Sequence, residues 1–344
     1  MSSTACKSFP DTRIVIFRLG SMGDTVVALP CFHAVRRSFP AAHITLLTNF
    51  PVSSKAAPML DILGEQSGFV DGVAQYPIGL RNPIGLLRLF FQLKGLKSTT
   101  LVYMRSKPSR KLIRRDSIFF RLAGFHHILC APENDDQRLS RFDPVTQELE
   151  HEASRLARCF SALRPIDLND PAFWDLKLSD AEKSQANHLA SLLLSPFLVI
   201  NTGGKEASKD WGVESWASFL RSFKQQSGMP GLAIIGGADD KARADFLVEC
   251  WGEGAVSFCG VLSPRVAAAL VASAHLFVGH DSGPLHLAQC SNTPALGLFG
   301  SFNKPKQWHP YGSHIRVIHE LKGMNAISVD RVLYKALSMA ATPR

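Results

Sequence analysis

Short apolar runs, many with β-branched residues, recur along this chain, and each one ends in a polar or glycine-containing turn. A continuous apolar run of this kind is typical of a parallel strand that is buried on both faces. The runs cover residues 13–18, 43–48, 69–76 and 99–104 in the first half, and 197–201, 232–235, 276–279 and 295–299 in the second. Since segments with helical spacing lie between these runs, the pattern predicts an α/β protein with doubly wound parallel sheets.

The helices are predicted from apolar residues at helical spacing and from residues that favour a helix start. Pro264 and Pro284 each lie close behind a serine, where a proline in the first turn loses no hydrogen bond. Pro30 either kinks the helix that runs toward Arg37 or begins its main part. The expected helices are 84–96, 151–163, a stretch behind Trp211, 240–249, 264–274, 284–290 and 328–337.

The length of 344 residues is long for one domain and suits two. Residues 164–173 contain Pro165 and Pro171, which predicts a linker there. We therefore expect one Rossmann-like domain over residues 1–170, a second over 171–325, and a final helical segment over 326–344.

Composition narrows the class of protein. Apolar residues make up 46% of the chain and charged residues 19%, which is typical of a globular protein with a sizeable core. No apolar run reaches the roughly 18 residues of a membrane span, and the amino terminus does not resemble a secretory signal, so we expect a cytoplasmic protein. The seven cysteines are scattered and form no C-x-x-C pair, which predicts reduced thiols and no metal site.

The formal net charge of +9 is concentrated in one segment. Residues 81–121 contain eleven basic residues and one acid, Asp116, so the rest of the chain is close to neutral. Such a basic face can serve solubility alone. It can also bind an anionic partner, and the leucines and phenylalanines between the charges favour a membrane surface or a lipid over nucleic acid.

The first strand runs into residues 19–24, LGSMGD. These glycines let the backbone approach a ligand closely. Their spacing differs from the G-x-G-x-x-G of dinucleotide-binding proteins, which argues against a Rossmann dehydrogenase. Asp24 can stabilise the start of the next helix, or it can deprotonate a hydroxyl group at the end of the strand.

In the second half, Thr202-Gly203-Gly204 follows a strand, with Lys209 in the loop behind it. A glycine turn with lysines behind it can cradle a diphosphate, although loop lysines are often merely solvated. After the next strand, Asp240, with Asp239 as the second choice, either holds ribose hydroxyls or caps a helix.

Residues 276–310 carry the densest set of candidate residues. Their order of strand, Asp281-Ser282-Gly283 turn, helix and strand is half of a doubly wound sheet, whose ligands bind at the carboxyl ends of strands. The Ser282 and Gly283 amides would open a helix whose positive end favours an anion such as a phosphate. Alternatively, Asp281 and Ser282 only cap that helix.

These motifs together resemble glycosyltransferase family 9, the bacterial ADP-heptose:lipopolysaccharide heptosyltransferases. The resemblance rests on Ser21-x-Gly23-Asp24, on Lys209 before the aromatic Trp211, and on Asp281-Ser282-Gly283 followed by His286 and a strand that ends in Phe299-Gly300. It covers essentially the whole chain and implies the GT-B fold, in which two Rossmann-like domains face a central cleft. The chain contains no D-x-D triplet, the metal-binding device of the other main glycosyltransferase architecture.

The resemblance implies an inverting, metal-independent transfer of a heptose from ADP-heptose to a lipopolysaccharide inner core or related glycan, without a cofactor. Asp24 would be the catalytic base, and Lys209 would stabilise the leaving diphosphate. The residues that bind the nucleotide sugar would be Ser21, Gly23, Thr202, Lys209, Asp240, Asp281, Ser282, Gly283 and His286. The acceptor, an acidic glycolipid at the cytoplasmic face of the inner membrane, would contact Arg105, Lys107, Arg110 and Arg114.

The same resemblance implies that the final helix crosses back onto the first domain. Two features depart from the family pattern: Lys304 stands before Pro305, and the Gly203-Gly204 pair loosens the phosphate loop. Three alternatives stay open, namely a transferase of the same fold with another nucleotide sugar, a GT-B-like nucleotide-sugar epimerase, and a basic nucleic-acid-binding protein. The last is the weakest, because no nucleic-acid-binding motif is present.

Overall fold

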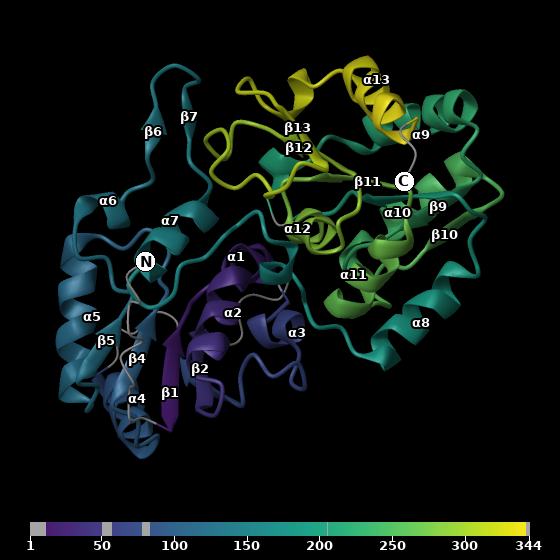
Figure 1. Ribbon diagram of the computed structural model, residues 1–344. Coiled ribbons are helices and arrows are strands. Elements are labelled where there is room, and N and C mark those ends of the chain that lie inside the picture. The colour runs from purple at the N-terminus through teal and green to yellow at the C-terminus, as the bar shows by residue number, and fades with distance from the viewer. Residues whose placement is uncertain (1–11, 50–56, 78–82, 205, 342–344) are drawn as a thin grey trace, which may run out of the picture. The chain divides into compact units, whose positions relative to one another are not determined.

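The computed structural model describes residues 12–49, 57–77, 83–204 and 206–341. The chain divides into two compact units (Figure 1). The first comprises Met1–Ser54, Pro58–Arg141 and Glu152–Phe173, and the second comprises Lys55–Ala57, Phe142–His151 and Trp174–Arg344. Residues 142–151, which we expected in the first domain, therefore group with the second unit.

The first unit is built on a parallel sheet with the strand order β3-β2-β1-β4-β5. Its strands are β1 (Arg13–Phe17), β2 (His43–Asn49), β3 (Gly72–Tyr76), β4 (Thr100–Tyr103) and β5 (His127–Leu129). Its helices are α1 (Met22–Val27), α2 (Leu29–Ser38), α3 (Met59–Leu63), α4 (Pro83–Gly95), α5 (Arg110–Leu122), α6 (Asp135–Arg138) and α7 (Glu152–Phe160). β1 and β4 are almost wholly buried, as continuous apolar strands in the middle of a parallel sheet must be.

The second unit has a parallel sheet with the order β10-β9-β8-β11-β12-β13 and a short antiparallel pair, β6 (Phe142–Asp143) and β7 (Glu148–Leu149). Its other strands are β8 (Phe197–Asn201), β9 (Gly231–Ile234), β10 (Ala255–Ser257), β11 (Leu276–His280), β12 (Ala295–Phe299) and β13 (Ile315–His319). Its helices are α8 (Asp180–Ala190), α9 (Val213–Ser227), α10 (Lys241–Trp251), α11 (Pro264–Ser273), α12 (Gly283–Cys290) and α13 (Val329–Ala340).

All eight apolar runs that the sequence pattern assigns to strands are strands in the structure. Proline acts as a helix starter at two of the expected positions, since Pro264 and Pro284 lie in the first turns of α11 and α12. Pro30 likewise lies in the first turn of α2, after α1 has ended at Val27, so it begins a new helix rather than kinking one.

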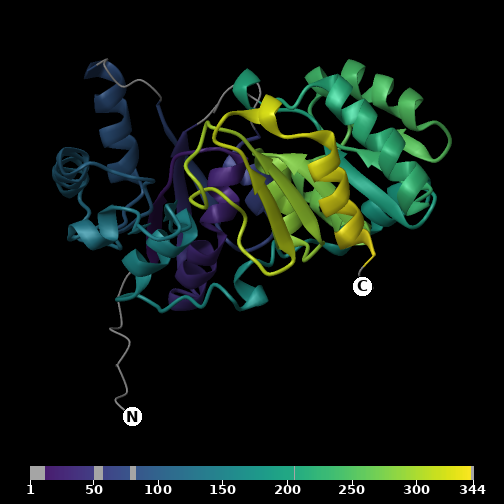
Figure 2. The same ribbon diagram turned by 90° about the horizontal axis from the view of Figure 1, so that it is seen from above.

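The final helix packs within the second unit. Its apolar stripe, Val332, Leu333 and Ala336, belongs to the core of the second unit. α13, yellow in Figures 1 and 2, packs against α9 and β11 of that unit. The stripe is therefore accounted for within the second unit, and packing of this helix onto the first domain stays a prediction.

Each sheet reverses its strand order at one point, between β1 and β4 in the first unit and between β8 and β11 in the second. In doubly wound sheets ligands bind beside the carboxyl ends of the strands at this point. Lys209 and Asp281 lie in the segments that follow β8 and β11, and Asp24 lies in the first turn of α1, directly after β1. Within the described residues, no helix combines the length and the apolar composition needed to cross a membrane.

Candidate active site

The first group of candidate residues lies behind β1, where the chain turns into α1. Gly20 has a φ of +147°, and a Cβ atom there would lie 2.4 Å from the Cβ of Asp24. Only glycine accommodates both this backbone angle and this close approach. The Gly20 amide donates to Oδ1 of Asn49, the last residue of β2, at 2.8 Å. The turn is thus fixed against the neighbouring strand.

Asp24 serves the start of α1 and remains partly open to solvent. Its Oδ2 accepts a hydrogen bond from the Ser21 amide at 3.0 Å, and Ser21 is the residue before the first turn of α1. Its Oδ1 lies 3.9 Å from a guanidinium nitrogen of Arg18, and 27% of the Asp24 side chain is exposed. The helix-start and general-base interpretations are therefore compatible.

Arg18 holds this turn in place and is not predicted from the sequence pattern. Its buried guanidinium donates to the backbone carbonyl of Asp24 at 2.8 Å and to that of Met104 at 2.7 Å. Burial lowers the pKa of Arg18, and the negative charges of Asp24 and Glu152 oppose that shift. Arg18 thereby ties the backbone of the Asp24 turn to the end of β4.

In the second unit, the structure brings Lys209 and Asp281 together across 72 residues of sequence. The Lys209 ammonium lies 2.9 Å from Oδ2 of Asp281, and both side chains are largely buried. The Asn303 amide donates to the same oxygen at 2.6 Å, and the Phe302 ring lies 4.3 Å below the ammonium. The loop after β12 thus completes a cluster of charge at the carboxyl ends of β8 and β11.

Neither Asp281 nor Ser282 caps α12 through its side chain. The Ser282 hydroxyl donates to Oδ1 of Asn201 at 2.7 Å, and the Asn201 amide donates to the carbonyl of Ile235 at 3.0 Å. This chain of bonds links the ends of three adjacent strands, β11, β8 and β9. The cap interpretation of this turn is wrong, because both side chains are engaged elsewhere.

Asp240 lies where it can face the ends of β8 and β9. A Cβ atom on Gly203 would lie 2.2 Å from its Oδ2, and one on Gly236 would lie 2.6 Å from the same atom. Both glycines therefore make room for this carboxylate. Its Oδ2 also accepts from the Gly237 amide at 2.9 Å, within the short turn before α10, whereas its side chain makes no cap hydrogen bond to α10. The helix-cap interpretation of Asp240 is therefore wrong.

An ion pair between Asp210 and Arg243 links the two loops of this site, and no sequence signal points to it. Arg243 binds the Asp210 carboxylate through two nitrogens, at 2.6 and 3.1 Å, and donates to the buried Thr202 carbonyl at 2.8 Å. Burial raises the pKa of Asp210, but bonds from Arg243 and from the Gly212 amide outweigh it, so the net shift is downward. The pair fixes the Thr202 turn relative to the Lys209 loop.

His280, at the end of β11, is a buried hydrogen-bond acceptor with a structural role. Its Nε2 accepts from the Trp216 indole at 3.0 Å and from the Trp211 amide at 3.3 Å. Both donors require an unprotonated ring nitrogen. Burial lowers the pKa of His280 to about 4, so the ring is neutral at physiological pH and holds the segment next to Lys209 against the sheet.

The candidate His286 is 3% exposed within α12 and lies near a group of half-buried histidines, His151, His309 and His319. His309 Nε2 lies 2.8 Å from His319 Nδ1. Burial and the neighbouring rings of His319, His151 and His286 lower the pKa of His309 to about 3. His286 thus lies inside the second unit, on the helix that follows the Asp281–Gly283 turn, and its role in binding the nucleotide sugar stays a prediction.

The four basic candidates for acceptor binding differ in their surroundings. Arg105 lies 3.2 Å from the buried Asp116 carboxylate, and the exposed Arg110 binds Asp135 at 2.6 Å. Lys107 and Arg114 are exposed, Lys107 in the loop after β4 and Arg114 on α5. The first two are therefore partly neutralised by acids of the same unit.

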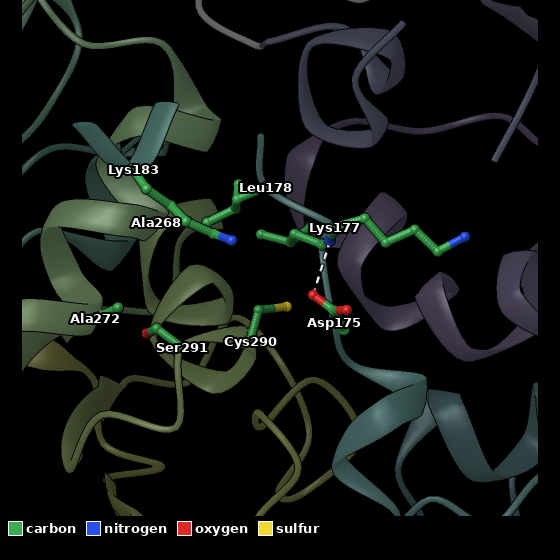
Figure 3. A pocket seen from close by; sticks show the side chains of 9 residues that line it. Asp175, Lys177, Leu178, Lys183, Ala268, Ala272, Cys290 and Ser291 are labelled. Carbon is green, nitrogen blue, oxygen red and sulfur yellow. Dashed lines mark hydrogen bonds between the residues drawn. The ribbon is translucent and has the colours of Figure 1, made fainter. Parts of the chain in front are cut away.

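The second unit also contains a cavity of about 440 Å³ at the far end of α12, among α8, α11 and residues 175–178 (Figure 3). Cys290 and Lys183 point toward it, and the Asp175 carboxylate accepts from the Lys177 amide at 2.8 Å. None of its lining residues is a candidate site residue. The cavity is thus separate from the cluster around Lys209.

Comparison with known families identifies the family of this chain. A family model described as glycosyltransferase family 9 (heptosyltransferase) matches residues 135–332, more than half of the chain. The chain belongs to this family.

Three proteins show how similar this family 9 chain is to known members. It is 26% identical over 170 residues to lipopolysaccharide heptosyltransferase 3 of Escherichia coli strain K12. The matched segment covers 48% of this chain and 49% of that relative, so the chain spans about half the length of the relative. A solved family 9 glycosyltransferase of Veillonella parvula DSM 2008 has a TM-score of 0.73 at 18% identity, over 97% of this chain and 98% of that one. The E. coli ADP-heptose lipopolysaccharide heptosyltransferase II has a TM-score of 0.65 at 18% identity, over 95% and 98%. The expected GT-B architecture of two Rossmann-like units is confirmed.

Proposed function

We propose that this family 9 protein transfers a heptose from ADP-heptose to a lipopolysaccharide inner core or related glycan, with inversion at the anomeric carbon. The observation that carries the proposal is the Lys209–Asp281 pair at the carboxyl ends of β8 and β11. It places a cation for a diphosphate and a carboxylate for sugar hydroxyls next to the first turn of α12. The similarity to an E. coli enzyme whose name includes ADP-heptose supports the choice of donor.

Asp24 is the proposed base. It accepts the proton of the acceptor hydroxyl while that oxygen bonds to the anomeric carbon, and the bond from this carbon to the diphosphate breaks. The electron pair of the broken bond leaves with ADP. The partial exposure of Asp24 supports this role, because a base must reach a substrate hydroxyl.

The leaving diphosphate gains negative charge during the reaction. Lys209 and the amides of Ser282 and Gly283 would stabilise it without a metal ion. The diphosphate competes with Asp281 for the Lys209 ammonium, so donor binding frees Asp281 oxygens for sugar hydroxyls. Asp240 would hold the ribose from the ends of β8 and β9, beside the Thr202 turn.

The acceptor is proposed to be an acidic glycolipid at the cytoplasmic face of the inner membrane. Arg105, Lys107, Arg110 and Arg114 of the first unit would meet its phosphate and carboxylate groups. The proposal involves no cofactor and no nucleic acid.

Calorimetric titration with ADP, UDP and GDP tests the donor. We expect ADP to bind selectively and Lys209→Ala to weaken it by about tenfold or more, because a charge-assisted bond to a phosphate is lost. Lys241→Ala is the matched control, since Lys241 is 64% exposed and forms an ion pair with Asp245 on the same helix, α10. Preference for UDP or GDP would leave the assignment of the fold unchanged and would exclude ADP-heptose as the donor.

Product analysis separates a transferase from an epimerase. With ADP-heptose alone, a transferase should leave the donor sugar unchanged, and with an acceptor it should release ADP in equal amount to the glycan formed. Isomerised donor without any acceptor would instead identify an epimerase.

A further inference from the structure

The first unit carries a helix that is apolar on two opposite faces. Leu89 and Leu93 of α4 are 1% exposed and pack into the core of the unit. Ile84, Leu87 and Phe91 are 56 to 62% exposed. Their spacing of three and four residues places them on one stripe, turned away from the core. A stripe of three large apolar side chains in water is unfavourable unless a partner covers it.

The neighbouring helix α5 continues this surface. α4 and α5 cover the same face of the sheet, because Leu89, Leu93 and Phe120 share one core, and the Phe90 and Phe119 rings lie 6.3 Å apart (Figures 1 and 2). On the outer side of α5, Ile118 and Leu122 are 51% and 66% exposed. Both helices thus carry exposed apolar residues on the side that faces away from their shared core.

Basic side chains surround these apolar ones. Arg88 and Lys94 extend from α4, and Lys111, Arg114 and Arg121 extend from α5. Asp116 pairs with Arg105 and Arg115, and Asp135 pairs with Arg110. Among the described residues, no carboxylate lies within ion-pair distance of any of the five basic side chains named first.

We propose that the outer faces of α4 and α5 form a docking surface for an anionic lipid bilayer, with Leu87 and Phe91 entering the acyl boundary and the basic side chains binding lipid phosphates. We refer to this surface as the docking face. It comprises Ile84, Leu87, Arg88, Phe91 and Lys94 of α4, and Lys111, Arg114, Ile118, Arg121 and Leu122 of α5. Apolar residues with a basic rim are the composition of helices that lie in the headgroup region of membranes.

The positive charge of the docking face favours an anionic bilayer over a second copy of the chain or a protein partner. A second copy of the chain would bring an equal positive charge against it, which opposes association. A protein partner would have to be acidic and concave to fit two projecting helices, whereas a bilayer needs no shaped pocket. The inference rests on the proposed function for its biological setting, since a lipid-linked acceptor lies in a membrane.

Vesicle flotation of the full chain tests the docking face. We expect binding to phosphatidylcholine vesicles only when phosphatidylglycerol is added, and weaker binding at high salt. Leu87→Gln with Phe91→Gln should lower the vesicle partition by about tenfold or more, because two apolar side chains no longer leave water. Arg88→Gln with Arg121→Gln should lower it by about fivefold per charge at low salt.

The matched control is Leu192→Gln with Phe246→Gln, which removes two apolar side chains, 57% and 40% exposed, from the second unit. This variant should bind vesicles like the natural chain. Equal loss in both variants, or no binding to anionic vesicles, would overturn the inference. So would concentration-dependent dimers that only the Leu87 and Phe91 variant abolishes, since a second copy would then cover the face.

ADP titration and transfer to a water-soluble acceptor separate this inference from the proposed function. If the proposed function is right, the docking-face variants retain both while they lose vesicle binding. Normal vesicle binding without ADP binding would retain the docking face and reject the proposed donor.

Discussion

At the start of α1, the Asp24 carboxylate accepts from the Ser21 amide through one oxygen, and the other faces Arg18 at 3.9 Å. Asp24→Asn retains an oxygen for the Ser21 amide but cannot take up a proton. We expect transfer to fall by about a hundredfold or more, the usual contribution of a general base, with unchanged ADP affinity and little change in stability. Steady-state kinetics and calorimetry measure both, and loss of ADP binding together with transfer would mean that Asp24 is structural.

Removing the Asp281 charge and removing the Lys209 charge should have different effects on ADP affinity, with only the loss of Lys209 weakening it. In the structure, Asp281 pairs with the Lys209 ammonium that the diphosphate is proposed to bind. Asp281→Asn removes a negative charge beside the diphosphate and frees Lys209, so ADP should bind at least as tightly as before. Transfer should nevertheless fall by about tenfold or more, because a charge-assisted bond to the sugar is lost. Weaker ADP binding in Asp281→Asn would show that the pair acts as a unit to shape the site.

At the scale of elements, the geometry of the turn after β8 requires glycine at position 203 but not at position 204. A Cβ atom on Gly203 would overlap the Asp240 carboxylate, whereas one on Gly204 would meet nothing within 4 Å. Gly203→Ala should therefore displace Asp240 and weaken ADP binding by about tenfold, the order expected when a charged hydrogen bond is lost. Gly204→Ala should leave the affinity unchanged, and an equal effect of both substitutions would exclude a role for Asp240 in the nucleotide site.

The elements of this fold were largely predictable because the central strands of a parallel sheet are continuous apolar runs, as in β8 and β12. The strands that the pattern misses lie at sheet edges or outside the sheets. β10 has three partly buried residues, and the exposed Arg316 interrupts β13. β6 and β7 have two residues each. Such segments carry no apolar run to detect.

The site was predictable only where its residues follow strands. Asp24, Asp240 and Asp281 each stand in a turn behind a strand and could be proposed from that position. The Asp210–Arg243 pair joins residues 33 apart in sequence, and Asn303 reaches Asp281 across 22. No local pattern signals such contacts, since tertiary folding alone brings them together. Arg18 looks like a charged strand end in sequence and becomes a buried anchor in the structure.

At the scale of the whole molecule, the two units have separate cores and can be followed separately. All five tryptophans, Trp174, Trp211, Trp216, Trp251 and Trp308, lie in the second unit. Tryptophan fluorescence therefore reports the unfolding of the unit that is proposed to bind the donor. Two of these tryptophans donate directly to His280.

The pKa of His280 predicts how the stability of the second unit depends on pH. This pKa is about 4 in the folded chain and about 6.5 as its ordinary value. Between these values the unfolded chain binds a proton that the folded chain does not, so the free energy of unfolding increases with pH in this window. The full contribution of His280 to the free energy of unfolding is present above pH 6.5. About 3 kcal/mol should be lost as the pH falls to 4.

Urea unfolding followed by tryptophan fluorescence between pH 7.5 and about 4.5 checks this prediction. Asp210 and Glu182 also have lowered pKa values and lose their contributions as the pH falls through their ordinary values of 3.8 and 4.5, so histidines dominate the dependence above pH 5. His309, His319 and His314 also have lowered pKa values, and they steepen the dependence in the same direction. His280→Gln, which keeps an acceptor for the Trp216 indole, should remove one proton from the slope and leave the rest. A slope unchanged by His280→Gln would mean that His280 has the same pKa in the folded and the unfolded chain, and would contradict its burial and its role as acceptor for Trp211 and Trp216.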